Sequence, residues 1–256
     1  MPTFRRLEER PVFSPLFALR ERAAARWRYP ERRAAFEAIR ARRTGERCFV
    51  LGTAPSLAGH DLDRLDGEAY FACNMAERLP WMQGRTHPYY IAADMAVPEK
   101  YDGGRPGLSA RQFFFARKLA PRLDPGFVAG NDVFLFAPAK GGIGVRGLTP
   151  EPWVSLGWGH TILISAVQMA WAIGYREIYV MGCDLDYSGP APYAYGTIGA
   201  EPARSGDDEM RIVTNAQFGI LHRAIAAQGG TLANAGIGGR LETLPRVDYD
   251  GLFRAV

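Results

Sequence analysis

The sequence predicts an α/β protein with a Rossmann-like, mostly parallel sheet, helices on both faces and a basic helical segment at the N-terminal end. Three observations predict this class. Short apolar runs recur after residue 45, helical stretches separate several of them, and the runs end in small or polar residues. Apolar runs without polar alternation are typical of strands buried on both faces, and strands that alternate with helices form a parallel sheet.

The composition indicates one globular domain with an appendage. The 256 residues are 47% apolar and 23% charged, which is enough apolar material for a sizeable core. The three cysteines lie far apart, so we expect reduced core residues rather than disulfides or a metal clamp. The longest nearly apolar run, Ile162–Gly174, is too short to cross the roughly 30 Å of a bilayer core. We expect residues 1–45 to form the appendage and residues 46–256 to form the α/β domain.

Residues 1–47 concentrate the basic charge. They hold 13 arginines and six glutamates, a net charge of +7, whereas the rest of the chain holds 18 basic and 21 acidic residues. A mildly acidic body excludes a nucleic-acid footprint over the whole protein. The segment predicts two helices, about residues 14–30 and Glu31–Arg43, whose arginines and aromatic residues suit an anionic membrane surface. The alternative is a solvated helix that packs on the body through its apolar side chains.

The N-terminal end lacks the apolar core and cleavage site of a secretory signal. We therefore expect a cytoplasmic protein. Contact of residues 1–43 with the inner face of the membrane stays open beside the alternative of a helix packed on the body. The oligomeric state stays open.

The apolar runs define the strands in chain order. They are residues 48–52, 69–74, 89–94, 133–137, 178–184 and 231–234, and the predicted helices are Ser109–Leu123, Thr161–Ile173 and Arg211–Gln228. In parallel sheets of this kind, ligands bind beyond the carboxyl ends of the strands. The residues just after each run are therefore the candidate site.

The first run ends in a glycine turn, residues 52–56 (GTAPS). Gly52 lets a ligand approach the backbone, and Ser56 can cap a short helix whose free N–H groups attract a phosphate. The turn is neither GxGxxG nor a P-loop. An ordinary strand-to-helix turn is the alternative.

Polar residues also end the later runs. Asn74 and Asp94 can hydrogen-bond a ribose or a base, or can each simply cap a turn. Residues 184–186 (DLD) imitate the Asp-x-Asp by which many sugar transferases hold a divalent metal under a diphosphate. The pattern is short and common by chance, so the metal requirement stays open.

A long loop, from Tyr187 to about Asp208, follows the fifth run and is typical of a lid. Its tyrosines can hydrogen-bond a phosphate oxygen without adding charge, or can pack the loop onto the body. Thr161 and His160 begin the crossover helix, where either can cap the helix or meet a phosphate. His222 shares a helix with core residues and is expected at the core edge.

An ordered set of motifs resembles the bacterial lipooligosaccharide sialyltransferases. The matching segments are residues 52–56 (GTAPS), 73–74 (CN), 170–184 (AWAIGYREIYVMGCD) and 193–195 (YAY), and the resemblance covers roughly residues 47–236. Members of that family transfer sialic acid from CMP-sialic acid and share the α/β fold. The resemblance implies a CMP-linked nucleotide-sugar donor and a glycan or lipid acceptor.

The resemblance also implies roles for individual residues. Thr53 and Ser56 would approach the phosphate and sugar, and Asn74 and Asp94 would approach the nucleotide. Tyr187 and Tyr193, six residues apart as in the family, would meet the leaving CMP phosphate.

With these roles, the predicted catalytic residues are Tyr187, Tyr193 and Asp184. The predicted nucleotide-binding residues are Gly52, Thr53, Ser56, Asn74, Asp94 and Thr161.

The sequence departs from the family pattern at three places. Thr53 replaces an Asn, Ile162 stands where a Ser is usual, and no His lies between Tyr195 and Asn215, where the family keeps its general base. Residues 234–248 (NAGIGGRLETLPRVD) are similar instead to the MptE-like proteins, named for an archaeal hydroxymethylpterin diphosphokinase.

The favoured interpretation is a glycosyltransferase of cell-surface polysaccharide or lipopolysaccharide synthesis. Diphosphoryl transfer from ATP and a non-enzymatic nucleotide-binding module are the alternatives.

Overall fold

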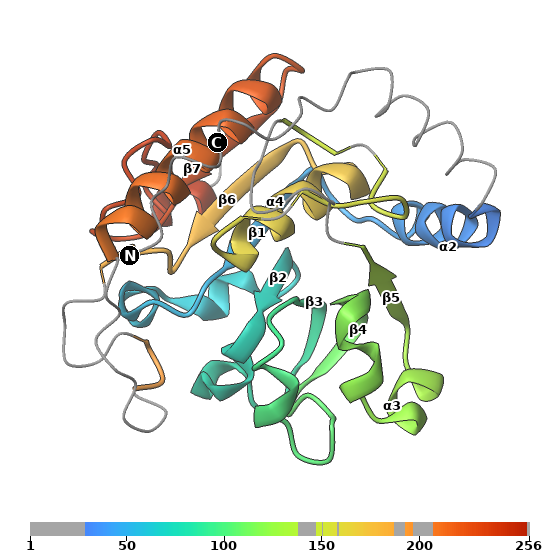
Figure 1. Ribbon diagram of the computed structural model, residues 1–256. Coiled ribbons are helices and arrows are strands. Elements are labelled where there is room, and N and C mark those ends of the chain that lie inside the picture. Colours follow the sequence, from blue (N-terminus) through green and yellow to red (C-terminus); the bar gives the residue numbers. More distant parts are fainter. Residues whose placement is uncertain are drawn as a thin grey trace, which may run out of the picture.

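The computed structural model describes residues 29–137, 147–149, 151–157, 159–186, 193–196 and 207–254. Its centre is a seven-stranded sheet in the order β5-β4-β3-β2-β1-β6-β7, in which every pair of neighbouring strands is parallel (Figure 1). The strands are β1 Arg47–Leu51, β2 Ala69–Cys73, β3 Thr86–Ala92, β4 Ser109–Ala116, β5 Val133–Phe136, β6 Glu177–Met181 and β7 Thr231–Asn234. The predicted fold class is confirmed.

The layers follow from the handedness of the connections. The chain moves outward from β1 to β5 and then returns across the sheet to β6 beside β1, before it continues to β7. Right-handed crossovers place connections that run in opposite directions on opposite faces. Helices α4 (Ile162–Ile173) and α5 (Asp207–Ala226) therefore share one face, where α4 lies against the central strands and contacts both α5 and α2 (Pro30–Ala41). The short helix α3 (Pro125–Gly130) belongs to the opposite face.

The aromatic core shows the two faces directly. Side chains of consecutive strand residues point to opposite sides of the sheet. Phe114 of β4 packs on Phe134, which contacts Phe36 of α2, whereas the neighbouring Phe113 packs on Phe127 of α3. The side chains of the three β4 phenylalanines are completely or almost completely buried, so β4 lies within the core.

One predicted helix is wrong. Residues 109–123 form strand β4 followed by the 3-10 helix Arg117–Arg122, not an α-helix. The run Phe113–Ala116 has no polar position to face solvent, and it pairs with β3 and β5. Pro121 also removes a backbone donor that a continuing α-helix needs. The other two predicted helices are confirmed as α4 and α5.

The predicted basic segment is described only from residue 29 onward. Its second helix is confirmed as α2, and Phe36 and Ile39 of that helix are buried in the same core as the sheet. The first predicted helix, about residues 14–30, lies almost entirely outside the described residues. Within the described ranges, no helix has both the length and the apolar character needed to cross a membrane.

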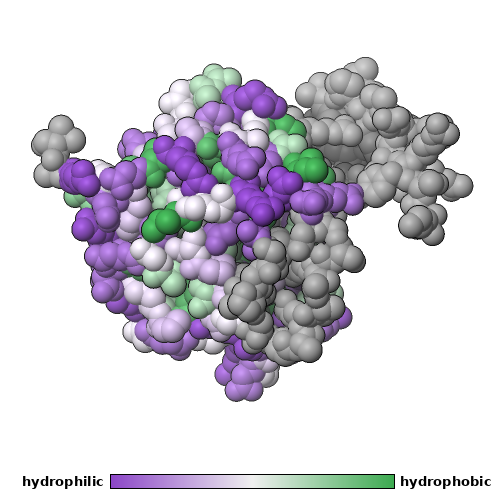
Figure 2. Space-filling model, turned by 90° about the vertical axis from the view of Figure 1, so that its left-hand side faces the viewer, coloured by the Kyte–Doolittle hydropathy of each residue, from purple (hydrophilic) through white to green (hydrophobic). Residues whose placement is uncertain are grey.

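The described surface is largely hydrophilic on the side shown in Figure 2, where hydrophobic residues occur singly or in small groups. Larger exposed apolar patches usually mark interaction surfaces. The described part of this face therefore has no broad apolar surface. All three cysteines are free thiols, as predicted, with Cys48 and Cys73 buried and Cys183 half-buried.

Candidate functional site

β1 and β6 are neighbours in the sheet, and the chain leaves them in opposite directions: from β1 toward β2, and from β6 toward β7. The candidate site lies at the carboxyl ends of these two strands. The amide of Gly52 donates to the carbonyl of Met181 over 2.9 Å, and the amide of Ala54 donates to that of Gly182 over 3.1 Å. A methyl group on Gly52 would lie 2.1 Å from the Gly182 oxygen and 3.2 Å from Leu163 of α4. The predicted glycine is thus required by backbone packing, because no side chain fits between β1, β6 and α4.

Ser56 and Asp184 form the main polar link between these loops. One carboxylate oxygen of Asp184 accepts from the Ser56 amide over 3.0 Å, and the other accepts from the Ser56 hydroxyl. Both side chains are half-buried. The contact fixes the start of the 3-10 helix Pro55–Gly59, and it engages both oxygens of the carboxylate that was a candidate metal ligand.

The tyrosine loop reaches the same turn. The amide of Ala194 donates to the carbonyl of Thr53 over 2.8 Å. The rings of Tyr193 and Tyr195 stack with their centroids 5.1 Å apart. Tyr193 is therefore adjacent in the chain to a residue bound to the glycine turn, while Tyr187 lies outside the described residues.

Asn74 follows β2 and has two unusual properties. Its φ is +49°, a left-handed conformation that is uncommon for residues other than glycine. Its side-chain oxygen is buried, yet no hydrogen-bond partner for it exists among the described residues. The backbone carbonyl of Asn74 is held by the hydroxyl of Tyr90 over 2.5 Å. The amide side chain thus presents an unused acceptor near the end of the strand next to β1.

Asp94 and Thr161 have local contacts that match the capping alternative. Asp94 follows β3, is exposed, and accepts from the Ala96 amide over 3.0 Å. Thr161 caps α4 by accepting from the Leu163 amide over 3.4 Å. Both residues lie at the carboxyl edge, but neither is joined to the link between Ser56 and Asp184 by a described hydrogen bond.

The loop after β7 completes this edge, and sequence reasoning missed it. The amide of Arg240 donates to the carbonyl of Asp184 over 2.6 Å, and Gly239 packs directly against the Asp184 backbone with a φ of +71°. The Arg246 guanidinium donates to the carbonyls of Gly236, Gly238 and Gly239. The glycines of this loop are a sequence signal for close packing of its backbone against Asp184. Nothing in the sequence indicated the role of Arg246.

His60 is a second residue that the sequence did not single out. Its Nδ1 lies 3.0 Å from the carbonyl oxygen of Ser56, and its Nε2 lies 3.0 Å from that of Ala235. The ring therefore joins the loop after β1 to the loop after β7. Since both nitrogens face carbonyl oxygens, His60 is a structural bridge here and leaves no ring nitrogen for a substrate proton.

His222, Cys73 and Cys183 could each act as an acid, a base or a nucleophile, but their surroundings indicate structural roles. His222 lies at the core edge, as expected, with its Nδ1 3.0 Å from the carbonyl oxygen of Leu232. Burial raises the pKa of the thiols of Cys73 and Cys183, so neither supplies a thiolate at neutral pH. In the described part of the chain, no three His, Cys, Asp or Glu side chains are grouped as metal ligands.

Two described cavities lie at the opposite edge of the sheet. They have volumes of about 320 and 560 Å³ and are lined by residues at the amino ends of the strands. The switch between β1 and β6 marks the carboxyl edge as the ligand site of this class of sheet. The topology and the buried side-chain oxygen of Asn74 therefore both indicate a candidate site at the carboxyl edge, away from these two cavities.

The fold and site define an all-parallel α/β protein with its candidate ligand site at the topological switch. No family model matches the chain, and no curated protein sequence matches it. Among solved structures it is similar to the sialyltransferase CstII from Campylobacter jejuni in complex with the substrate analogue CMP-3FNeuAc, with 14% identity, a TM-score of 0.45, and coverage of 79% of this chain and 86% of the other. A variant of CST-II in complex with CMP gives 14% identity, a TM-score of 0.49, and coverage of 82% and 89%. These similarities concern the fold alone.

Proposed function

We propose that the protein is a glycosyltransferase that uses a nucleotide sugar, with a CMP-linked donor favoured, and transfers the sugar to a glycan or lipid acceptor. The observation that carries the proposal is the side-chain oxygen of Asn74 at the carboxyl edge, which is buried and has no hydrogen-bond partner within the described part of the chain. Leaving a buried acceptor without a partner costs about 1–3 kcal/mol, so such groups in native proteins call for a partner.

The chemistry of this acceptor favours an amine of a nucleobase. Cytosine carries an exocyclic amino group that donates hydrogen bonds, and an amide oxygen is a suitable acceptor for it. The left-handed backbone of Asn74 is a strained conformation of the kind that clusters at binding sites. In this arrangement the base lies over the end of β2 and the phosphate lies toward β1.

The glycine turn would receive the phosphate. The amides of Gly52, Ala54 and Ser56 and the Ser56 hydroxyl are already engaged, and Pro55 has no N–H, so the turn offers the amide and the hydroxyl of Thr53. In this proposal Asp184 positions the turn through its hydrogen bonds to Ser56 and does not contact the nucleotide. Asp94 and Thr161 would contribute at the rim of the same edge.

Leaving-group stabilisation would come from Tyr193 and, by the resemblance, Tyr187. A departing CMP carries a monophosphate, whose developing charge phenol hydroxyls can stabilise in the transition state. A diphosphokinase must instead neutralise a triphosphate with Mg²⁺. Both oxygens of Asp184 are engaged by Ser56, which favours the transferase over that alternative.

The test measures CMP release from CMP-N-acetylneuraminate and, separately, the affinity for CMP, each with the intact protein and with Asn74→Ala. We expect the variant to bind CMP at least about tenfold more weakly, which corresponds to about 1.4 kcal/mol. Asn131→Ala is the matched control, because Asn131 is exposed and its side-chain amide donates to the carbonyl of Phe127 in its own turn. Turnover that survives a chelator supports the transferase. Turnover of ATP with a pterin alcohol that is lost with a chelator would instead identify a diphosphokinase. CMP binding without turnover would identify a non-enzymatic binding module.

The tyrosines are tested separately. The double variant Tyr187→Phe with Tyr193→Phe should lower kcat strongly while CMP affinity changes less, because the charge that the hydroxyls meet develops chiefly in the transition state. Equal turnover in the intact and double-variant proteins would remove both residues from the mechanism.

The proposed acceptor places the reaction at the inner membrane face, with the basic N-terminal residues as the contact. Deletion of residues 1–28 leaves the buried residues of α2 intact and is therefore the suitable variant. Binding to vesicles of anionic phospholipid at low salt should fall in this variant, and salt should weaken binding of the intact chain. Equal binding by both proteins would rule out the membrane contact.

A further inference from the structure

We propose that the larger cavity at the amino edge of the sheet is a second binding site, for a hydroxylated anion such as a sugar carboxylate or a sugar phosphate. The cavity has a volume of about 560 Å³, within the range of small-molecule sites. It lies at the opposite end of the strands from the candidate transferase site. The proposal is therefore independent of the glycosyltransferase assignment.

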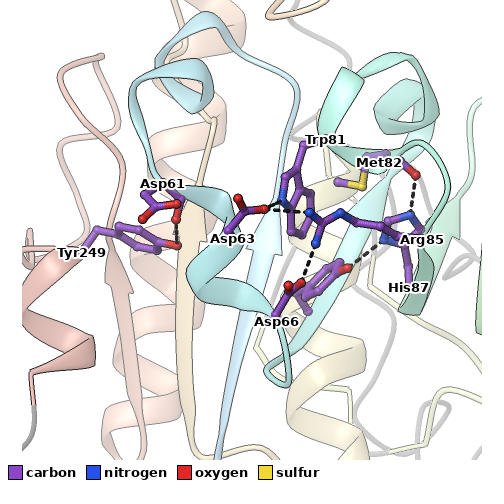
Figure 3. Close-up of polar contacts among 9 residues, drawn as sticks. Asp61, Asp63, Asp66, Trp81, Met82, Arg85, His87 and Tyr249 are labelled. Atoms are coloured by element: carbon purple, nitrogen blue, oxygen red, sulfur yellow. Dashed lines mark hydrogen bonds and ion pairs between the residues drawn. The ribbon is translucent and has the colours of Figure 1, made fainter.

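One wall of the cavity is an arginine held rigidly from three sides. The guanidinium of Arg85, just before β3, bonds to Asp66 over 2.6 Å and to Asp63 over 2.7 Å (Figure 3). It also lies 4.9 Å from the ring centroid of Trp81, whose indole N–H bonds to Asp63 over 2.9 Å. This wall is held in place before any ligand arrives, which lowers the entropic cost of binding.

The second wall is built in the same way from distant parts of the chain. Arg42, directly after α2, bonds to Asp132 over 2.8 Å and to the side-chain oxygen of Gln112 over 3.1 Å. The buried Gln112 amide donates in turn to the carbonyl of Asp132 over 2.8 Å. The charges of Arg42 and Asp132 therefore neutralise each other within the wall.

Arg111 is the lining cation that stands apart. It is exposed on β4, next to Gln112, and within the described part of the chain its guanidinium has no ion pair or hydrogen bond. Of the three arginines that line the cavity, Arg42 pairs with one carboxylate and Arg85 with two, so the guanidinium not already engaged by a carboxylate is that of Arg111. A guanidinium binds a carboxylate or phosphate through paired, charge-assisted hydrogen bonds, which indicates an anion.

The rest of the lining indicates that the anion carries hydroxyl groups. Asp66 and Asp132 retain lone pairs beyond those used by their arginines, and carboxylate oxygens accept from ligand hydroxyls. Thr44 and Thr86 add hydroxyls to the lining. A bare inorganic anion would leave most of these groups and most of the cavity volume unused.

Fixed tyrosines back the cavity. The hydroxyls of Tyr89 and Tyr175 lie 2.9 Å apart, and that of Tyr70 donates to Nδ1 of His87 over 2.7 Å. His87 Nε2 lies 2.9 Å from the Met82 carbonyl oxygen (Figure 3), so His87 donates there. Its Nδ1 then accepts from Tyr70. Burial raises the pKa of Tyr70 to about 12, which keeps its phenol neutral. The back of the cavity is thus rigid and uncharged.

The experiment is calorimetric titration of the full chain with three probes: glucuronate, glucose 6-phosphate and glucose. We expect one or both anions to bind and neutral glucose not to bind under the same conditions. Binding of glucuronate alone identifies sugar carboxylates as the ligand class, and binding of glucose 6-phosphate alone identifies sugar phosphates. Failure of both anions to bind would overturn the proposal.

Variants test the role of the free charge. Arg111→Gln should weaken binding of the anion by about tenfold or more, and Arg111→Lys should retain part of the affinity because it keeps the charge without the paired donors. Arg223→Gln, which removes an exposed arginine of α5, is the matched control and should leave the affinity unchanged. Equal affinity in Arg111→Gln and in the intact protein would contradict the site.

A competition arm separates the two edges of the sheet. Saturating CMP should leave the affinity for the sugar anion unaltered, since the proposed nucleotide site lies at the carboxyl ends of the strands. Displacement of the sugar anion by CMP would assign the anion to the carboxyl edge and overturn the amino-edge proposal. The two proposals thus fail on different results.

Discussion

The two edges of the sheet are held together by different means. At the carboxyl edge, loops after β1, β6 and β7 are joined by backbone contacts of glycines and by short hydrogen bonds to Asp184. At the amino edge, arginines and carboxylates from separate loops form ion pairs around a cavity. Close contacts between backbones therefore stabilise the carboxyl edge, whereas ion pairs between side chains stabilise the amino edge.

The largest expected effect breaks the carboxyl edge at its tightest point. Gly52→Ala would place a methyl group 2.1 Å from the Gly182 oxygen, so strands or loops must shift. We expect a loss of about 3 kcal/mol of unfolding free energy, at the upper end of the overpacking range. Urea denaturation measures it, with Gly130→Ala as the control because nothing lies near that position. Equal stability of the two variants would show that the strand ends are not closely packed.

The next effect concerns the polar link at the same edge. Asp184→Asn removes one acceptor for the two donors of Ser56, and a half-buried donor without a partner costs about 2 kcal/mol. Asp208→Asn is the control, since that carboxylate is largely exposed and its ion pair contributes little. If the two variants lose the same small amount of stability in urea, Asp184 is not a structural link.

The loop after β7 gives a smaller effect. Arg246→Ala removes donors to three carbonyls, but the side chain is exposed, so we expect a loss of about 1 kcal/mol. Hydrogen exchange should also become faster for the amides of residues 236–240. Arg254→Ala, which removes a single surface contact of 3.4 Å, serves as the control. Unchanged exchange in the Arg246 variant would remove this side chain from the account of the edge.

The smallest expected effect is the pH dependence of stability that comes from His87 at the amino edge. Burial lowers the pKa of His87 below its ordinary value of 6.5, so below pH 6.5 the unfolded chain takes up a proton that the folded chain resists. Unfolding free energy should therefore fall as the pH drops through this range, by less than the roughly 1.4 kcal/mol per pH unit of one full proton. His87→Gln should flatten this dependence and His222→Gln should not. A slope that is unchanged in His87→Gln would assign the pH response elsewhere.

The carboxyl edge was partly predictable because its signals are local. A glycine directly after an apolar run marks a close approach, and the tyrosines and Asp184 follow their strands in the chain. The sequence did not reveal that Asp184 would bind Ser56, since 128 positions separate the two residues. Nor did it reveal the left-handed backbone of Asn74, for which the neighbouring residues give no cue.

The amino edge could not be predicted in the same way. Arg42 and Asp132 are 90 positions apart and meet only because α2 and β5 pack on the same sheet. Charged residues just before strands are common on protein surfaces, so neither arginine nor aspartate is informative by itself. The missed strand β4 belongs to the same difficulty, because the interpretation of residues 109–123 as a helix removed Arg111 and Gln112 from the sheet.

A crystal structure of the protein soaked with CMP tests the central claim most directly. We expect nucleotide density at the carboxyl ends of β1 and β2, with the cytosine amino group within about 3 Å of the Asn74 side-chain oxygen. The phosphate should lie on the turn formed by residues 52–56. Density for CMP only at the amino-edge cavity, or at the carboxyl edge with the Asn74 oxygen still unpartnered, would contradict it.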